Sequence, residues 1–319
     1  FLLGHYRFWS KEALIFKKYN CKIVVNPYGG DMYMYSKLKD PCVLHGFMMS
    51  YPKNADKEEE IERKVRYWSK NADCFKPNLA IDGLNKWSVL PYNTLAINTN
   101  EWVAKNKYSD SNGKNGIVVV AHCPNHRGIK GTEFIINAVD ELKKEGLKVK
   151  LLLLEKLQNL EVKRILFEEV DILVEQLVLC AYALSGVEGM VTGLPVISNL
   201  DFEESTRLFR RYSFLNECPI LSSNPETIKQ NLKILIANPH LRKDLGQSGR
   251  SYVEKYHSYS ATGVLFTKIY DKIWHNKDVD LMNMYNPLNP DSYNNQSPLI
   301  NHPLVENKIP KEIMKKLNK

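Results

Sequence analysis

Two cations, Arg127 and Lys130, stand in a polar loop that follows a run of β-branched residues at 117–120. The run is short enough to be a buried strand. After the loop, Gly131 and Thr132 lead into a segment whose apolar residues have helical spacing. The first N–H groups of a helix have no partners within it, and its dipole is positive at that end. This order predicts an anion site, for which diphosphate is the natural ligand. The alternative is that Arg127 and Lys130 are only solvated loop cations.

Length and composition set the class of protein that must position these residues. The chain has 319 residues, of which 44% are hydrophobic and 25% are charged. These proportions are typical of a soluble globular protein, and the length predicts two domains. No apolar run approaches the roughly 18 residues that a membrane span needs.

The six cysteines are scattered along the chain without paired spacing. This pattern indicates neither a zinc site nor a disulfide framework, and it favours a reducing, cytoplasmic location. The formal net charge is +8. Such a charge fits a polyanion partner, an anionic membrane surface, or only a Lys-rich proteome.

The front of the chain contains one clear strand, at 21–26, followed by a turn with two glycines. In open parallel sheets, ligands bind at the carboxyl ends of strands, which is where this turn falls. Gly30 and Asp31 are therefore candidates for ligand contact, although a plain turn uses these residue types equally well. Tyr28, in the same turn, is expected to pack. Residues 55–71 are expected to form a charged helix with one apolar stripe.

The second half of the chain is more regular. A polar, glycine-bearing linker at 104–116 precedes it. Strands then alternate with helices up to about residue 275, which predicts a doubly wound parallel sheet. The segment 276–319 is rich in Asn and Pro and is expected to be extended or partly disordered. Because the chain begins at Phe1 and already reads as mid-fold, we expect a piece that lacks its first strands.

Three stretches carry a resemblance to a known family. They are HCPNHRGIKGTEFIINAVDELKKEG, DILVEQLVLCAYALSGVEGMVTGLPVIS and NPETIKQNLKILIANPHLRKDLGQSGRSYVEKYHS. Together they resemble the donor-binding half of group 1, family four type, glycosyltransferases with the GT-B fold. The match covers roughly residues 116 to 275, and KIVVNPYGGDMY at the front resembles the family more loosely.

The resemblance implies an α/β fold with two Rossmann-like domains that face each other across a cleft, the first of them incomplete. The implied division is a partial acceptor-side domain (1–103), a linker (104–116), a nucleotide-sugar donor-binding domain (117–275) and a polar tail (276–319).

The resemblance also implies an activity: transfer of a sugar from a nucleotide diphosphate-sugar to a glycan or lipid-linked acceptor, with retention of configuration. The co-substrate is then the nucleotide-sugar, and no metal or other cofactor is expected. Arg127 and Lys130 match the family's basic pair, which stabilises the leaving diphosphate. Polysaccharide assembly at the cytoplasmic face of a membrane is implied as the setting, with peripheral contact with anionic lipid.

Glu188 matches the second acidic residue of the family's Glu-(seven residues)-Glu motif, which holds the donor ribose. A carboxylate suits that role because it accepts from two vicinal hydroxyls. The alternative is a first-turn Glu favoured by the helix dipole. Cys180 stands where the first acidic residue is expected, and it is expected to be a small packing residue. The resemblance adds five donor-site candidates: Gly131, Gln176, Tyr182, Gly30 and Asp31.

His122 ends the strand that precedes the loop with Arg127 and Lys130. It either faces the cleft or is a hydrogen-bonded core residue.

Two other functions compete with sugar transfer. One is a nucleotide-sugar-binding relative that has lost catalysis, which the Cys at position 180 suggests. The other is nucleic-acid binding, suggested only by the net charge. The basic residues are dispersed and no nucleic-acid motif is present, so no nucleic-acid partner is expected.

Overall fold

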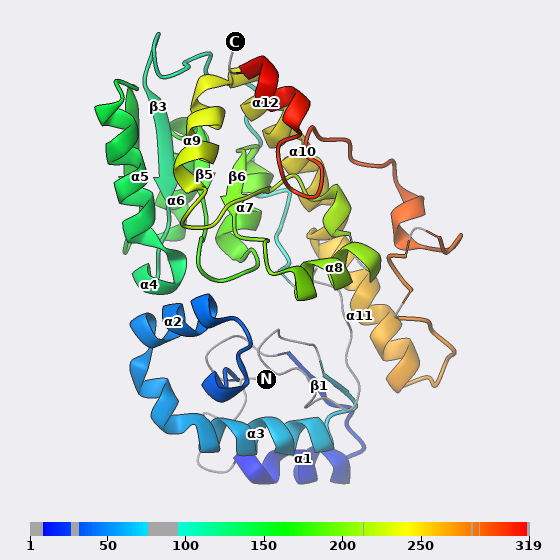
Figure 1. Ribbon diagram of the computed structural model, residues 1–319. Helices are drawn as coiled ribbons and strands as arrows, with labels where there is room; N and C mark the ends of the chain where they lie inside the picture. Colours follow the sequence, from blue (N-terminus) through cyan, green and yellow to red (C-terminus); the bar gives the residue numbers. More distant parts are fainter. Residues whose placement is uncertain are drawn as a thin grey trace.

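The computed structural model describes residues 9–26, 32–75, 95–212, 214–281, 283–286 and 288–317. They form two α/β parts, a smaller one from the front of the chain and a larger one from the rest (Figure 1). Each part contains a parallel sheet. The expected α/β class, with two parallel-sheet units of which the first is small, is confirmed.

The sheet of the larger part has five parallel strands in the order β4-β3-β5-β6-β7. They are β3 (Val118–His122), β4 (Val149–Leu153), β5 (Ile172–Val174), β6 (Val196–Ser198) and β7 (Leu221–Ser222). Counted from β3, this is the 2-1-3-4-5 order of a doubly wound sheet. The chain passes from β3 to β4 on one side and then crosses to β5 on the other. The boundary between β3 and β5 is therefore the switch point, where open sheets of this kind bind ligands.

Helices cover both faces of this sheet (Figure 1). One face carries α5 (Thr132–Lys144) and α9 (Ile228–Ala237). The other face carries α6 (Asn159–Glu168), α7 (Leu184–Thr192), α10 (Pro239–Tyr256) and α11 (Tyr259–Ile273). Strand β5 is buried on both of its faces, because Ile172 and Val174 belong to one hydrophobic core and Leu173 belongs to the other. Successive strand side chains point to opposite faces, so an all-apolar strand is buried on both.

The expected strand, loop and helix at 117–146 are present, with one addition. The loop contains a one-turn helix, α4 (Arg127–Lys130), before α5 begins. Gly131 joins the two helices with φ at +72°, and a Cβ there would lie 3.0 Å from Leu177 Cβ. Only glycine takes up this conformation without strain. The helix α5 ends, as expected, just before Gly146, whose φ is +88°.

The smaller part has two parallel strands in the described residues, β1 (Val24–Val25) and β2 (Cys74–Phe75). Its helices are α1 (Trp9–Lys18), α2 (Pro41–Ser50) and α3 (Glu58–Asn71). The predicted stripe of α3 is buried, with Ile61, Val65 and Trp68 in one core. The predicted glycine turn, with Tyr28, Gly30 and Asp31, lies outside the described residues.

The structure also has α8 (Glu203–Tyr212) and the 3-10 turns η1 (Tyr35–Lys37), η2 (Pro52–Lys57), η4 (Leu215–Glu217) and η5 (Tyr293–Gln296). Within the described ranges, no helix combines the length and the apolar character that crossing a bilayer requires.

The described residues after 276 pack on the larger part and, up to α12 (Lys311–Leu317), contain little helix or strand, which agrees with the extended alternative of the expectation. Tyr285 is 0% exposed, and its ring lies 5.0 Å from that of Phe214. Tyr293 donates a hydrogen bond of 2.6 Å to the carbonyl of Lys255. The segment ends in α12. A few aromatic anchors hold it, and its polar average composition conceals them.

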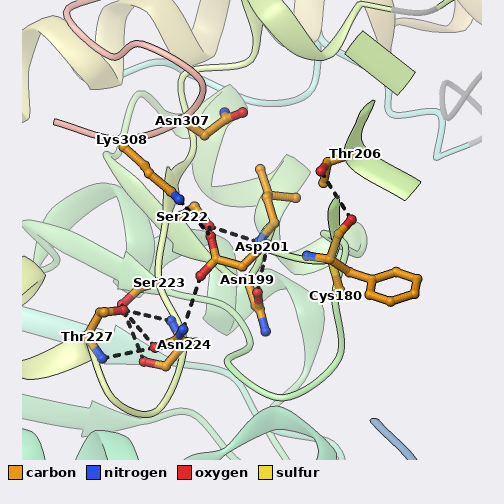
Figure 2. A network of polar contacts seen from close by, with 12 residues as sticks. Cys180, Asn199, Asp201, Thr206, Ser222, Ser223, Asn224, Thr227, Asn307 and Lys308 are labelled. Atoms are coloured by element: carbon orange, nitrogen blue, oxygen red, sulfur yellow. Dashed lines mark hydrogen bonds and ion pairs between the residues drawn. The ribbon is translucent and has the colours of Figure 1, made fainter. Parts of the chain in front are cut away.

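A polar network ties this segment to the carboxyl ends of β6 and β7 (Figure 2). Asp201 accepts hydrogen bonds from Ser222 Oγ at 2.7 Å and Asn224 Nδ2 at 3.1 Å. The ammonium of Lys308 lies 3.9 Å from the same carboxylate. The carbonyl of Asn307 accepts from the N–H of Ser222 at 2.8 Å. The network therefore braces the end of the chain against the sheet.

Candidate functional site

Two charged side chains meet at the switch point, on the carboxyl edge of the larger sheet. Lys130 lies in the loop after β3, and Glu175 directly follows β5. Their loops are joined by the backbone, because the N–H of Leu177 donates to the carbonyl of Lys130 at 3.1 Å. The fold therefore brings a predicted site residue to the place where a doubly wound sheet offers a ligand site.

Lys130 is buried, with 7% of the residue exposed. Its ammonium donates to the carboxylate of Glu175 and, at 2.8 Å, to Oε1 of Gln176. Such partners are necessary because an unpaired ammonium loses several kcal/mol of solvation on leaving water. The position of this cation is therefore fixed by two neighbouring residues of the loop after β5.

Glu175 stands in the second stretch that resembles the glycosyltransferases, but it was not among the predicted site residues. It is 1% exposed, and its carboxylate accepts hydrogen bonds from Ser185 Oγ at 3.0 Å and Ser198 Oγ at 2.9 Å, besides that of Lys130. The N–H of Ala183, at the start of α7, also donates to it at 3.3 Å. The available signal was its position, an acidic residue immediately after a buried strand.

Arg127 lies at the same edge but is exposed and has two carboxylate partners. Its Nε donates to Glu133 Oε1 at 2.9 Å, and its Nη1 donates to Glu155 Oε1 at 3.0 Å. The hydrogen bond with Glu133 is the main reason that the pKa of Arg127 is raised. Exposed pairs of this kind contribute little to stability, so a phosphate can displace either carboxylate at little cost.

Glu188 lies on α7 and is half-buried. Its Oε1 accepts a hydrogen bond of 3.1 Å from Asn159 Nδ2, at the start of α6. Burial raises the pKa of this carboxyl. The first-turn alternative is wrong, because α7 begins at Leu184 and has no acidic residue in its first turn.

Cys123 lies at the same edge of the sheet. It follows β3 directly, and burial raises the pKa of its thiol to about 12. The charges of Glu188 and Glu175 raise this pKa further and that of Lys130 lowers it. The thiol is therefore protonated at neutral pH and is no nucleophile. Across the part of the chain that the structure describes, no three His, Cys, Asp or Glu side chains are grouped so as to hold a metal ion.

His122 is a core residue, the second of its two expected outcomes. It is 0% exposed, with Nδ1 2.8 Å from the carbonyl of Val174 and Nε2 2.9 Å from Thr132 Oγ1. Burial lowers its pKa to about 4. A neutral ring that donates to the carbonyl and accepts from the hydroxyl satisfies both contacts. His122 thus ties β3 to β5 and to the start of α5.

Three other predicted residues need correction or qualification. Tyr182 is 3% exposed, and its hydroxyl lies 2.9 Å from Tyr252 Oη and 3.0 Å from His257 Nε2, so it packs in the core. Gln176 is 1% exposed, donates to backbone carbonyls and orients Lys130. A donor contact of either residue stays a prediction. Cys180 is buried, as expected of a packing residue.

The smaller part covers this edge through α2 (Figure 1). Ser50 Oγ accepts a hydrogen bond of 2.8 Å from the N–H of Ile129, in α4. The ring of Tyr51 lies 4.4 Å from that of His126. A Cβ at Gly128 would lie 2.8 Å from Ser50 Oγ, so glycine permits the close approach of the two helices. The site is therefore bordered by both parts of the molecule.

Comparisons with known proteins give little further information. No protein-family model matches the sequence, and no curated protein matches it. Among solved structures, the chain is similar to the crystal structure of WaaG, a glycosyltransferase involved in lipopolysaccharide biosynthesis. The similarity covers 86% of this chain and 85% of that chain, with 13% sequence identity and a TM-score of 0.44. A likeness this distant carries no inference about function.

Proposed function

We propose that the protein transfers a sugar from a nucleotide diphosphate-sugar to a glycan or lipid-linked acceptor. The observation that supports this most is that a buried ammonium, Lys130, and a half-buried carboxylate, Glu188, belong to the same edge of the larger sheet. Lys130 lies in the loop after β3, and Glu188 is hydrogen-bonded to Asn159 at the start of α6, which follows β4. The cation suits a diphosphate, and the carboxylate suits two vicinal ribose hydroxyls. Their place at the switch point is that of a ligand site.

The proposed chemistry needs stabilisation of charge more than a protein nucleophile. As the bond between the anomeric carbon and the phosphate oxygen breaks, the nucleoside diphosphate gains negative charge, which Lys130 and Arg127 stabilise. The acceptor oxygen forms the new bond to the anomeric carbon on the same face. Its proton passes to the departing phosphate oxygen. Configuration is thereby retained without a metal ion.

The test is a panel of UDP-, GDP- and ADP-sugars with release of the nucleoside diphosphate as the readout. We expect one donor class to be turned over, and Lys130→Met to lower kcat about 100-fold. Lys229→Met is the matched control, because Lys229 is 40% exposed and pairs with Glu141 and Glu145 on the outer surface. It should behave as the parent. A parent protein that binds none of these nucleotides would refute the proposal.

A second candidate is a nucleotide-sugar-binding protein without turnover. One observation favours it: both cations are already paired, Arg127 with Glu133 and Glu155, and Lys130 with Glu175. The same panel separates the two functions. Saturable binding without release of nucleoside diphosphate, in the presence of candidate acceptors, would favour the second.

A further inference from the structure

Glu175 is a buried ionisable group to which the proposed chemistry gives no role. Both of its carboxylate oxygens are engaged. Oε1 accepts from Lys130 Nζ and Ser185 Oγ, and Oε2 accepts from Ser198 Oγ and the N–H of Ala183. With 1% of the residue exposed, the carboxylate has no surface to offer a substrate. Any contribution to the reaction must therefore pass through one of these neighbours.

Lys130 is the neighbour through which charge can act. Gln176, its other partner, is a neutral amide that orients the ammonium without neutralising it. Among the residues that the structure describes, Glu175 alone supplies a negative charge in contact with it. A buried ammonium without its counterion is an uncompensated charge in a low dielectric, which favours the neutral amine. The neutral amine cannot stabilise a leaving diphosphate electrostatically.

Position 180 does not supply this carboxylate. The Sγ of Cys180 accepts a hydrogen bond of 3.2 Å from the N–H of Phe202, in the loop after β6. The side chain at position 180 is therefore directed toward the loop after β6.

We propose that Glu175 is a positioning residue that holds the Lys130 ammonium in place and keeps it charged. This rests on the proposed function of the site. It predicts that the effect of Glu175 on turnover vanishes when Lys130 is removed.

The experiment compares Glu175→Gln, Lys130→Met and the double variant, with a donor that the parent turns over. We expect E175Q to lower kcat/KM about 10- to 100-fold and to lose activity at a lower pH than the parent as the pH is raised. In the double variant, turnover should equal that of K130M within about twofold, because the two residues act as a unit. If E175Q does not fold, Ser198→Ala, which removes one hydrogen bond to the carboxylate, should shift the pH profile in the same direction by less.

The matched control is Glu217→Gln. Glu217 and Lys255 form a second buried pair, with 2.9 Å between Oε2 and Nζ and with side chains 7% and 5% exposed. This pair lies between η4 and α10, outside the site. E217Q should lower the thermal stability as E175Q does, but leave kcat/KM and the pH profile of the parent unchanged.

Two results would overturn the positioning role alone: an E175Q variant with the parent's pH profile, or full additivity of E175Q and K130M. A parent that binds no nucleoside diphosphate would instead overturn the proposed function, and the positioning role with it.

Discussion

Asn159 Nδ2 donates a hydrogen bond of 3.1 Å to Glu188 Oε1 and so links the start of α6 to the middle of α7 at the carboxyl edge of the sheet. The bond orients a carboxylate that its surroundings otherwise disfavour, because burial raises the pKa of Glu188. An ionisable side chain whose charged form is disfavoured by burial is typical of a binding site.

Replacing Glu188 by Gln should weaken the binding of a nucleoside diphosphate at least about tenfold, since charge-assisted hydrogen bonds contribute about 1.5–3 kcal/mol. The same change should raise the Tm at pH 7. The folded-state pKa lies above 4.5, so the penalty is absent below pH 4.5, accumulates as the pH rises to the folded pKa, and persists at neutral pH. Calorimetric titration and thermal unfolding measure both effects.

The control for this change is Glu141→Gln, an exposed carboxylate paired with Lys229 on α9. It should alter neither affinity nor Tm appreciably. An E188Q variant with the parent's affinity would remove Glu188 from the site.

The free energy of unfolding should fall as the pH drops from 6.5 to 4, in part because of His122 and His257. Both are 0% exposed, and burial lowers the pKa of each to about 4. Between these pH values the unfolded chain binds protons that the folded chain does not. Each histidine therefore removes about 3 kcal/mol over the interval, and its contribution is fully present above pH 6.5.

Urea unfolding at intervals between pH 7.5 and 4 measures this dependence. His122→Asn cannot titrate in this range, so its unfolding free energy should change less steeply with pH than that of the parent. An equal slope in parent and variant would show that His122 is charged in the folded protein.

The packing of α2 on the larger part depends on two glycines. A Cβ at Gly46 would lie 2.6 Å from Val178 Cγ1, and one at Gly128 would lie 2.8 Å from Ser50 Oγ. Alanine at both positions should force the two parts of the molecule apart, and small-angle scattering should detect a larger radius of gyration. Gly263→Ala is the control, because a Cβ there meets nothing within 4 Å. An unchanged radius in the double variant would contradict this description of the contact.

Asn307→Ala should destabilise the fold by about 2 kcal/mol or more. The side-chain amide donates to the carbonyls of Cys218 at 2.8 Å and Ile220 at 3.0 Å, and buried carbonyls left without a donor cost about 1–3 kcal/mol. Val305→Ala, two residues earlier and 64% exposed, should change little. Chemical denaturation compares the two, and equal stabilities would show that the C-terminal segment does not brace the sheet.

Local sequence patterns predicted the strand and the helix on either side of Lys130 well. The β-branched run before Lys130 and the helical spacing after Gly131 correspond to β3 and α5, since both signals depend on nearby residues. The one-turn helix α4 was not predicted, because four residues carry no periodicity. Glu188 was singled out from its spacing within a motif, and its contact with a donor stays a prediction.

Long-range partners could not be predicted. The core contacts of Tyr182 were not predicted, because its partners, Tyr252 and His257, lie at least 70 positions later in the chain. The pairing of Glu175 with Lys130 was not predicted for the same reason, since it spans 45 positions. Buried polar pairs are decided by tertiary packing, which no local spacing records.

The most direct test of the whole account is a crystal structure with a bound nucleoside diphosphate. The account predicts phosphate oxygens within about 3.2 Å of Lys130 Nζ or the Arg127 guanidinium. It also predicts both ribose hydroxyls in contact with Glu188. A nucleotide bound elsewhere, with Lys130 and Glu188 untouched, would contradict it.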